Sequence, residues 1–186
     1  MRMLVRYLIT DPKYYSNDKN IFEQKLKKAL TKNIDMACFR DKSSSNFEEL
    51  AEVFIKVCKE KNIQQYLINS NITLAKKLNA TGVHLNSKQF DKIKEAKNLE
   101  LFTIISCHNE DEIKKALDNN IDAITYSPIF FTPNKGKAKG IENLEYIISK
   151  YKELKIIALG GIIDENHIKQ IKASKACGFA SIRYFI

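Results

Sequence analysis

The segment Leu-Phe-Thr-Ile-Ile-Ser-Cys-His-Asn-Glu-Asp-Glu-Ile-Lys-Lys-Ala-Leu, residues 101–117, joins a short apolar stretch to an amphipathic one. Residues 101–106 form a nearly continuous apolar run of strand length, whereas residues 110–117 repeat apolar side chains with a helical period. Ile113 and Leu117 fall on one helical face, and Glu110 falls on another. Continuous apolar strands followed by amphipathic helices are typical of a parallel sheet that is covered on its outer face.

The same alternation extends over the chain in both directions. It predicts a closed (β/α)₈ TIM barrel, an α/β fold, with a doubly wound parallel sheet as the alternative. Strands are expected at residues 4–10, 36–40, 65–69, 82–85, 101–106, 123–126, 155–159 and 178–183. Helices are expected at residues 22–30, 47–60, 72–78, 110–117 and 143–151, and Asp164 is the expected N-cap of a further helix.

The chain has 186 residues, whereas barrels of this type usually need about 250 residues, so the loops must be short. We expect residues 1–186 to form one compact barrel domain that lacks a full final helix, because the chain stops just after the last expected strand. Phe179 or Ile182 would then meet water on the outer flank of that strand, which favours a homodimer that covers it.

Composition limits the class of protein. The longest apolar runs are far below the roughly 20 residues of a membrane span, and charges interrupt the apolar start, so no membrane segment or secretory signal is expected. We expect a cytoplasmic protein. The four cysteines are scattered without a Cys-x-x-Cys pair, which argues against a zinc site or a disulfide framework. The net charge of +9 favours small anionic ligands over nucleic acid, because the lysines are spread over many helical faces.

Polar side chains gather where the expected strands end, which in a parallel barrel is the mouth that carries the active site. Arg40 and Lys42 lie two residues apart, so in an extended segment they point to the same side. A guanidinium fork and an ammonium group that converge there make a phosphate or diphosphate site. Another expected strand ends at Ser106, and His108, two residues later, is a further candidate ligand contact.

Two later segments suggest additional phosphate contacts. The loop at residues 131–140 carries Lys135 among other lysines and glycines, and it is predicted to act as a mobile lid over an anionic substrate. Gly160 and Gly161 follow an apolar strand and precede a helix, so their backbone amides can approach a phosphate at that helix N-terminus.

Taken together, these residues resemble the thiamine-phosphate synthase family, including its TenI-like thiazole tautomerase branch. The resemblance runs in order over roughly residues 4–183. The matching segments are Tyr-Leu-Ile-Thr-Asp at 7–11, Phe-Arg-Asp-Lys-Ser at 39–43, Leu-Ile-Asn at 67–69, Ala-Thr-Gly-Val-His-Leu at 80–85, Ile-Ser-Cys-His at 105–108, Ser-Pro-Ile-Phe-Phe-Thr-Pro-Asn-Lys at 127–135 and Ala-Leu-Gly-Gly-Ile at 158–162.

The resemblance implies a thiamine-biosynthesis transferase that joins hydroxymethylpyrimidine diphosphate to thiazole phosphate and releases pyrophosphate, with Mg²⁺ present. Its two phosphorylated substrates are the implied partners, and Arg40, Ser106 and Lys135 are the implied catalytic residues. The resemblance also assigns the diphosphate to Arg40, Lys42, Asn69 and Lys135, the leaving-group side to Ser106, and the thiazole phosphate to Thr132, Gly160 and Gly161.

The chain departs from the family pattern at several of these positions. Cys38 replaces a glutamine that contacts the pyrimidine, and Pro128 replaces the tautomerase histidine. Ser70 and Gln89 stand where synthases carry Mg²⁺-binding aspartates. Arg183 replaces a phosphate-binding serine and can still bind a phosphate.

No protein residue is therefore expected to ligate a metal, and Mg²⁺ would enter only with the substrate diphosphate. We hypothesise that Lys88 supplies part of the missing positive charge. Two alternatives to a synthase stay open: a metal-independent, TenI-like enzyme acting on a thiazole phosphate, and a non-catalytic binding or regulatory protein that kept the phosphate pockets.

Overall fold

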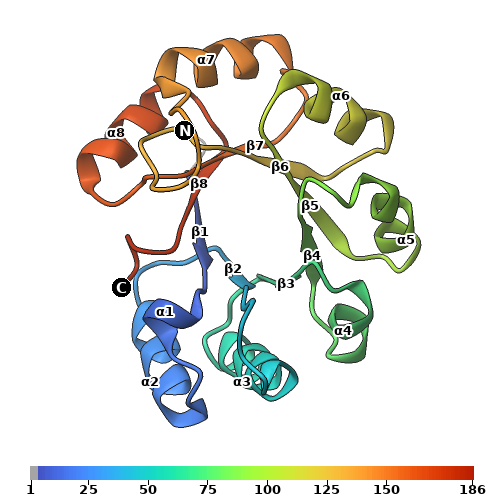
Figure 1. Cartoon of the computed structure of the whole chain (residues 1–186), viewed down its shortest axis with the longest axis vertical. Coiled ribbons are helices and arrows are strands. Elements are labelled where there is room, and N and C mark those ends of the chain that lie inside the picture. Colours follow the sequence, from blue (N-terminus) through green and yellow to red (C-terminus); the bar gives the residue numbers. More distant parts are fainter. Residues whose placement is uncertain (1–3) are drawn as a thin grey trace.

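The computed structural model describes residues 4–186, so residues 1–3 of the predicted single domain lie outside the described part. Eight parallel strands pair in chain order, and β8 pairs with β1 to close the barrel. Figure 1 shows the strands as a central ring with the helices around it. The predicted TIM barrel is confirmed, and closure excludes the doubly wound sheet.

The strands are β1 (Val5–Ile9), β2 (Met36–Phe39), β3 (Gln65–Asn69), β4 (Gly82–Leu85), β5 (Phe102–Cys107), β6 (Ala123–Tyr126), β7 (Ile156–Leu159) and β8 (Gly178–Ser181). The helices are α1 (Pro12–Tyr15), α2 (Lys19–Ala29), α3 (Phe47–Glu60), α4 (Ile72–Lys77), the 3₁₀ turn η1 (Phe90–Lys92), α5 (Ile93–Asn98), α6 (Glu110–Asp118), α7 (Gly140–Lys150) and α8 (Glu165–Ala173).

All eight predicted strands are present, with ends that differ by at most two residues. The helix predicted at residues 47–60 coincides with α3, and Asp164 caps α8 by accepting from the N–H of His167. No helical range was predicted for α1 or for η1 and α5. α1 and η1 have only four and three residues, too few to show a helical period in the sequence.

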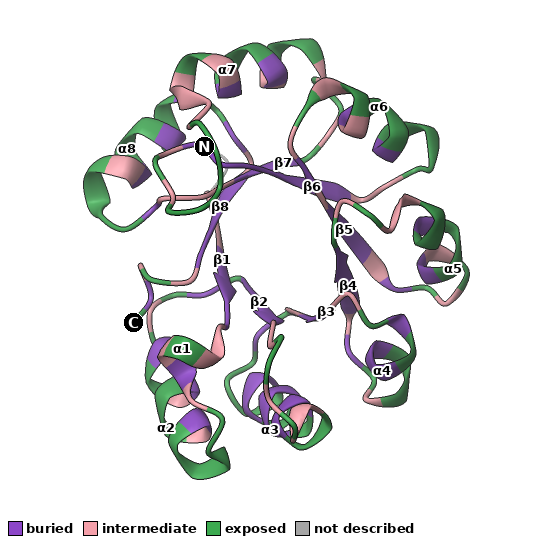
Figure 2. Cartoon of the chain, in the orientation of Figure 1, coloured by how far each residue is buried: buried purple, intermediate pink, exposed green. Residues whose placement is uncertain are grey.

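Two apolar layers hold the barrel together. Inside the ring, side chains such as Tyr7, Leu67 and Ile104 pack against one another. Outside it, the inner faces of the helices cover the strands, and Figure 2 shows the buried colour on the strands and on the inward side of the helices. Among residues 4–186, no helix is long and apolar enough to cross a membrane.

The flank of β8 differs from the prediction. No helix follows Ser181 in the described residues, as predicted, but Phe179 is fully buried within the single chain. Its ring stacks on Phe185 at 5.7 Å between centroids and meets Tyr184 edge-on at 5.4 Å. The prediction that Phe179 meets water is therefore wrong, because the last five residues fold back over it. Ile182, the other residue of that prediction, is half-buried and packs against the cluster inside the barrel. The homodimer stays a prediction without that support.

Candidate active site

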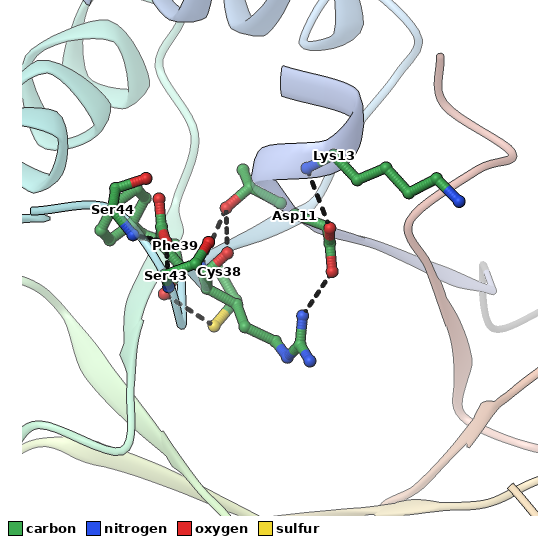
Figure 3. A network of polar contacts seen from close by, with 9 residues as sticks. Asp11, Lys13, Cys38, Phe39, Ser43 and Ser44 are labelled. Carbon is green, nitrogen blue, oxygen red and sulfur yellow. Dashed lines mark hydrogen bonds and ion pairs between the residues drawn. The ribbon is translucent and has the colours of Figure 1, made fainter. Parts of the chain in front are cut away.

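The carboxyl ends of β1 and β2 are joined at the barrel mouth. The hydroxyl of Thr10 accepts a hydrogen bond from the backbone N–H of Arg40 at 2.9 Å. Nη1 of Arg40 donates to Oδ2 of Asp11 at 2.7 Å, and Figure 3 shows the Asp11 carboxylate between this guanidinium and the backbone of Lys13. The ion pair holds the Arg40 side chain in place at the mouth, and it leaves the positive charges of the neighbouring Lys42 and Lys135 in place.

The pKa of Lys42 shows that Arg40, Lys42 and Lys135 lie close to one another. The positive charge of Arg40, followed by burial and the charge of Lys135, lowers the pKa of the Lys42 ammonium group. Like charges lower a lysine pKa only when they lie close to it. The structure thus brings together three of the predicted diphosphate residues from two separate loops, and the side chains of Lys42 and Lys135 remain exposed to solvent. Such a cluster favours a multiply charged anion.

The next part of the mouth consists of neutral amides and hydroxyls. Nδ2 of Asn69 donates to the backbone carbonyl of His84 at 2.9 Å. Nδ2 of Asn86 donates to Oε1 of Gln89 at 2.7 Å and to Oγ of Ser70 at 3.1 Å. Nε2 of Gln89 donates in turn to the backbone carbonyl of Ser70 at 3.1 Å. These side chains satisfy one another and form a closed, uncharged network.

This network does not fit the Mg²⁺ that the family resemblance implies. Mg²⁺ is held in proteins through one or two carboxylates together with substrate phosphates, and the network supplies none. The acidic groups that follow β1 and β2 are engaged elsewhere: Asp11 pairs with Arg40, and Oδ1 of Asp41 accepts from the N–H groups of Ser43 and Ser44 at 2.9 Å each. Within the described part of the chain, no three His, Cys, Asp or Glu side chains are grouped to hold a metal ion.

Ser106 lies at the end of β5, beside His84 on β4. Nε2 of His84 lies 3.1 Å from Oγ of Ser106, and its Nδ1 lies 2.9 Å from the hydroxyl of Tyr7. His84 is only 3% exposed, and burial, followed by the charge of Arg40, lowers its pKa to about 4. The imidazole is therefore neutral at neutral pH.

The opposite side of the mouth is shaped by two glycines after β7. Gly160 and Gly161 have φ angles of +98° and +70°, in the region that side chains disfavour. A Cβ atom on Gly161 would lie 2.5 Å from the Phe131 carbonyl oxygen. One on Gly160 would lie 2.7 Å from Cα of Pro128 and 3.3 Å from Oγ1 of Thr132. The two predicted phosphate segments therefore meet, with backbone amides and a hydroxyl side by side.

Three predicted residues join no such cluster. Lys88 and Arg183 follow β4 and β8, and both are exposed. Nδ1 of His108 lies 3.1 Å from the carbonyl oxygen and 3.2 Å from Oγ of Ser127, so this ring nitrogen is engaged with the backbone after β6. Their binding roles stay predictions.

A cavity of about 580 Å³ opens beside the ends of β1 and β2. Asp11 lies in its wall, so the cavity adjoins the Arg40 ion pair and extends the mouth toward α1 and α2. Its lining consists of Asp11, Pro12, Lys13, Ser16, Asn17, Lys25, Ser43 and Ser44.

Sequence reasoning missed the Asp11–Arg40 pair and the contacts of Tyr7 and Thr125 with His84. A signal for the second set exists in the alternation of strand residues, since side chains two apart point to the same face. Tyr7 and Ile104 are packed inside the barrel, and Ser106 lies two residues beyond Ile104. Alternation identifies such inward positions, but it does not identify their partners across the barrel.

Comparison with known proteins agrees with the barrel fold. A family model described as "Thiamine monophosphate synthase" matches residues 6–185. A thiamine-phosphate synthase of Anoxybacillus flavithermus is 32% identical over 168 residues, covering 84% of this chain and 76% of that protein. A thiamine-phosphate synthase of Pelagibacter ubique is 32% identical over 185 residues, which cover 97% of this chain and 87% of that protein. The solved structure of a thiamine phosphate pyrophosphorylase from Pyrococcus furiosus matches this chain with a TM-score of 0.82. The match covers 96% of this chain and 85% of that chain at 21% identity, so it supports the fold alone.

Proposed function

Because this chain belongs to the thiamine monophosphate synthase family, we propose that it joins hydroxymethylpyrimidine diphosphate to a thiazole phosphate and releases pyrophosphate. The observation that carries the proposal is the convergence of Arg40, Lys42 and Lys135 at the mouth. The uncharged side chains of Asn69 and Ser106 lie at the ends of β3 and β5, and both contact His84, whose pKa the charge of Arg40 helps to lower. A cationic site with neutral donors at its edge suits a leaving diphosphate.

The proposed reaction needs no covalent intermediate with the protein. The bond between the pyrimidine methylene carbon and the diphosphate oxygen breaks, and its electron pair leaves with the diphosphate. The thiazole nitrogen then donates its lone pair to that carbon to form the new C–N bond. Negative charge grows on the leaving oxygens, so fixed cations and hydrogen-bond donors lower the barrier by electrostatic stabilisation. Arg40, Lys42, Lys135 and Ser106 are the groups proposed to supply it.

The thiazole phosphate is proposed to bind on the other side of the mouth. The amides near Gly160 and Gly161 are the proposed donors to its oxygens, and Arg183 and His108 are further candidate contacts. The Thr132 hydroxyl donates to the Phe130 carbonyl at 3.1 Å, so it would have to turn from that carbonyl to donate to the phosphate. Binding there would hold the thiazole nitrogen toward the diphosphate side. Placing two reactants in one orientation accounts for a large part of the rate enhancement of such reactions. The 131–140 loop, which carries Lys135, would then close over both.

The test is synthesis of thiamine phosphate from the two purified substrates, measured by chromatography with a known synthase as positive control. Formation of thiamine phosphate supports the proposal, and the Arg40→Gln variant should lose it. Tight binding of pyrophosphate and thiazole phosphate by calorimetry without turnover would overturn the synthase and favour a non-catalytic binding protein. Isomerisation of a thiazole phosphate without condensation would overturn it in favour of the TenI-like alternative.

A further inference from the structure

A chain of polar side chains crosses the barrel interior to reach Ser106. The hydroxyl of Tyr7 on β1 lies 2.9 Å from Nδ1 of His84 on β4, and Nε2 of His84 lies 3.1 Å from Oγ of Ser106. The hydroxyl of Thr125 on β6 donates to Oγ of Ser106 at 3.3 Å. Tyr7 is fully buried and His84 nearly so, whereas Ser106 is half-buried at the mouth.

The protonation states of this chain are set by burial. Since burial lowers the pKa of His84 to about 4, its neutral ring carries one N–H and one acceptor nitrogen. Burial also raises the pKa of the Tyr7 hydroxyl, which therefore keeps its proton. Next to Tyr7 lies Cys38, whose thiol burial keeps protonated and whose Sγ donates to the Phe39 carbonyl.

The two tautomers of the neutral His84 ring give two hydrogen-bond orders from Tyr7 to the mouth. In the first, Tyr7 donates to Nδ1, so the N–H of His84 is on Nε2 and donates to Oγ of Ser106. In the second, Nδ1–H donates to Tyr7, whose own proton is left to the sulfur of Cys38, and Nε2 accepts from Ser106 at 3.1 Å or from the Thr125 hydroxyl at 3.3 Å. Thiol sulfur is a weak acceptor and imidazole nitrogen a strong one, so the first order is favoured.

The first order has a consequence at the mouth. Oγ of Ser106 accepts from both Nε2 of His84 and the hydroxyl of Thr125, which occupies both of its lone pairs. The Ser106 proton then has no partner among these three groups and is left to point toward the mouth. In the second order, Nε2 of His84 is an acceptor and competes for that proton.

We propose that Tyr7 and His84 are positioning residues that make Ser106 a hydrogen-bond donor to the leaving diphosphate. This inference rests on the proposed function, because it concerns the same reaction. Neither residue touches the substrate; both act through Ser106. The donor would serve chiefly the transition state, in which the leaving oxygens gain charge.

The kinetic test uses Tyr7→Phe, which removes the hydroxyl and keeps the ring. We expect kcat to fall about tenfold while KM for the pyrimidine diphosphate changes less than about twofold, as for an interaction made mainly in the transition state. Tyr126→Phe is the matched control, since it removes another buried tyrosine hydroxyl, which donates to Asn143 at 2.8 Å on the outer face of the sheet. It should leave kcat unchanged.

A double-mutant cycle separates positioning from simple destabilisation. If Tyr7 acts through Ser106, adding Tyr7→Phe to Ser106→Ala should cause less than about a twofold further loss of kcat. Independent, multiplicative losses would overturn the inference. Melting temperatures of all variants show whether each remains folded under the assay conditions.

Nitrogen-15 NMR of the His84 imidazole tests the hydrogen-bond order without any turnover. We expect a proton on Nε2 and none on Nδ1 in the native protein, and a mixture of tautomers in Tyr7→Phe. A proton on Nδ1 in the native protein would overturn the inference even if thiamine phosphate is made. Lack of thiamine phosphate synthesis with the expected tautomer would instead overturn the proposed function.

Discussion

Nη1 of Arg40 lies 2.7 Å from Oδ2 of Asp11, and Oδ1 of the same carboxylate accepts from the Lys13 N–H at 3.1 Å to cap α1. One aspartate thus begins a helix after β1 and holds the guanidinium that follows β2 (Figure 3). Because its negative charge lies beside a site that we assign to a diphosphate, Asp11 both orders Arg40 and competes with the ligand for it.

Replacing Asp11 with Asn should tighten pyrophosphate binding. Asparagine caps helices as well as aspartate, so its amide oxygen can replace Oδ1 at the Lys13 N–H, whereas its NH2 group cannot accept from Arg40. The cap is therefore kept, and the guanidinium is released from the competing charge. We expect the Kd from calorimetry to fall about threefold in low salt and the gain to shrink as salt is added. Asp11→Ala, which loses the cap as well, should not show this gain; weaker binding by Asp11→Asn would contradict the prediction.

Lys88 is predicted to add positive charge at the diphosphate. Lys88→Ala should raise the Kd for pyrophosphate by about three- to tenfold, the effect of losing one charge near a solvated anion site. Lys172→Ala is the control, because it removes the same charge from the last turn of α8, at the opposite end of the barrel. Equal affinities of Lys88→Ala and the unmodified chain would refute the hypothesis.

Ser70 offers a way to restore a metal ligand. Its φ angle is +58°, a conformation that Asp and Asn adopt more readily than most residues, so both substitutions should be accommodated. Ser70→Asp should lower the Mg²⁺ concentration that gives half-maximal activity by at least about fivefold, since Mg²⁺ prefers carboxylate oxygens. Ser70→Asn controls for size and shape. No difference between the two variants would mean that Ser70 does not face the bound diphosphate.

The glycine pair after β7 should be sensitive to a single methyl group. In Gly161→Ala the new Cβ would meet the Phe131 carbonyl oxygen, so the 131–140 loop must shift. We expect thiazole phosphate affinity to fall at least tenfold, about 1.4 kcal/mol, with pyrophosphate affinity nearly unchanged. Gly136→Ala is the control, because its φ is +75° but nothing lies within 4 Å of the added Cβ. Equal losses in both variants would point to backbone strain alone.

His84 should make the folded barrel less stable as the pH falls. Its folded pKa of about 4 lies below the ordinary 6.5, so between these values the unfolded chain binds a proton that the folded barrel does not. Stability from this residue is complete above pH 6.5 and is lost as the pH falls toward 4, by about 3 kcal/mol in all. Urea unfolding at several pH values should show this loss in the unmodified chain and not in His84→Gln. The same dependence of unfolding free energy on pH in the unmodified chain and in His84→Gln would contradict this prediction.

Much of this architecture is readable in the sequence because it depends on local patterns. Apolar runs and helical periods such as those at 101–117 identify strands and helices from neighbours a few residues apart. Since parallel strands all end at one rim, the same patterns place Arg40, Lys42, Asn69, Ser106 and Gly160 at the mouth. The alternation of strands and helices also predicts the barrel, and only the distinction from an open sheet required the pairing of β8 with β1.

Tertiary structure decided which of these side chains meet. Tyr7 and His84 are 77 residues apart on strands that are not neighbours in the sheet, and barrel closure brings them into hydrogen-bond distance. The burial of Phe179 likewise depends on how the last residues fold back over β8. The sequence indicates which face of its strand or helix each residue occupies, because that follows from the period of the backbone. Contacts across a barrel depend on its curvature and register, which arise only when all eight strands have paired.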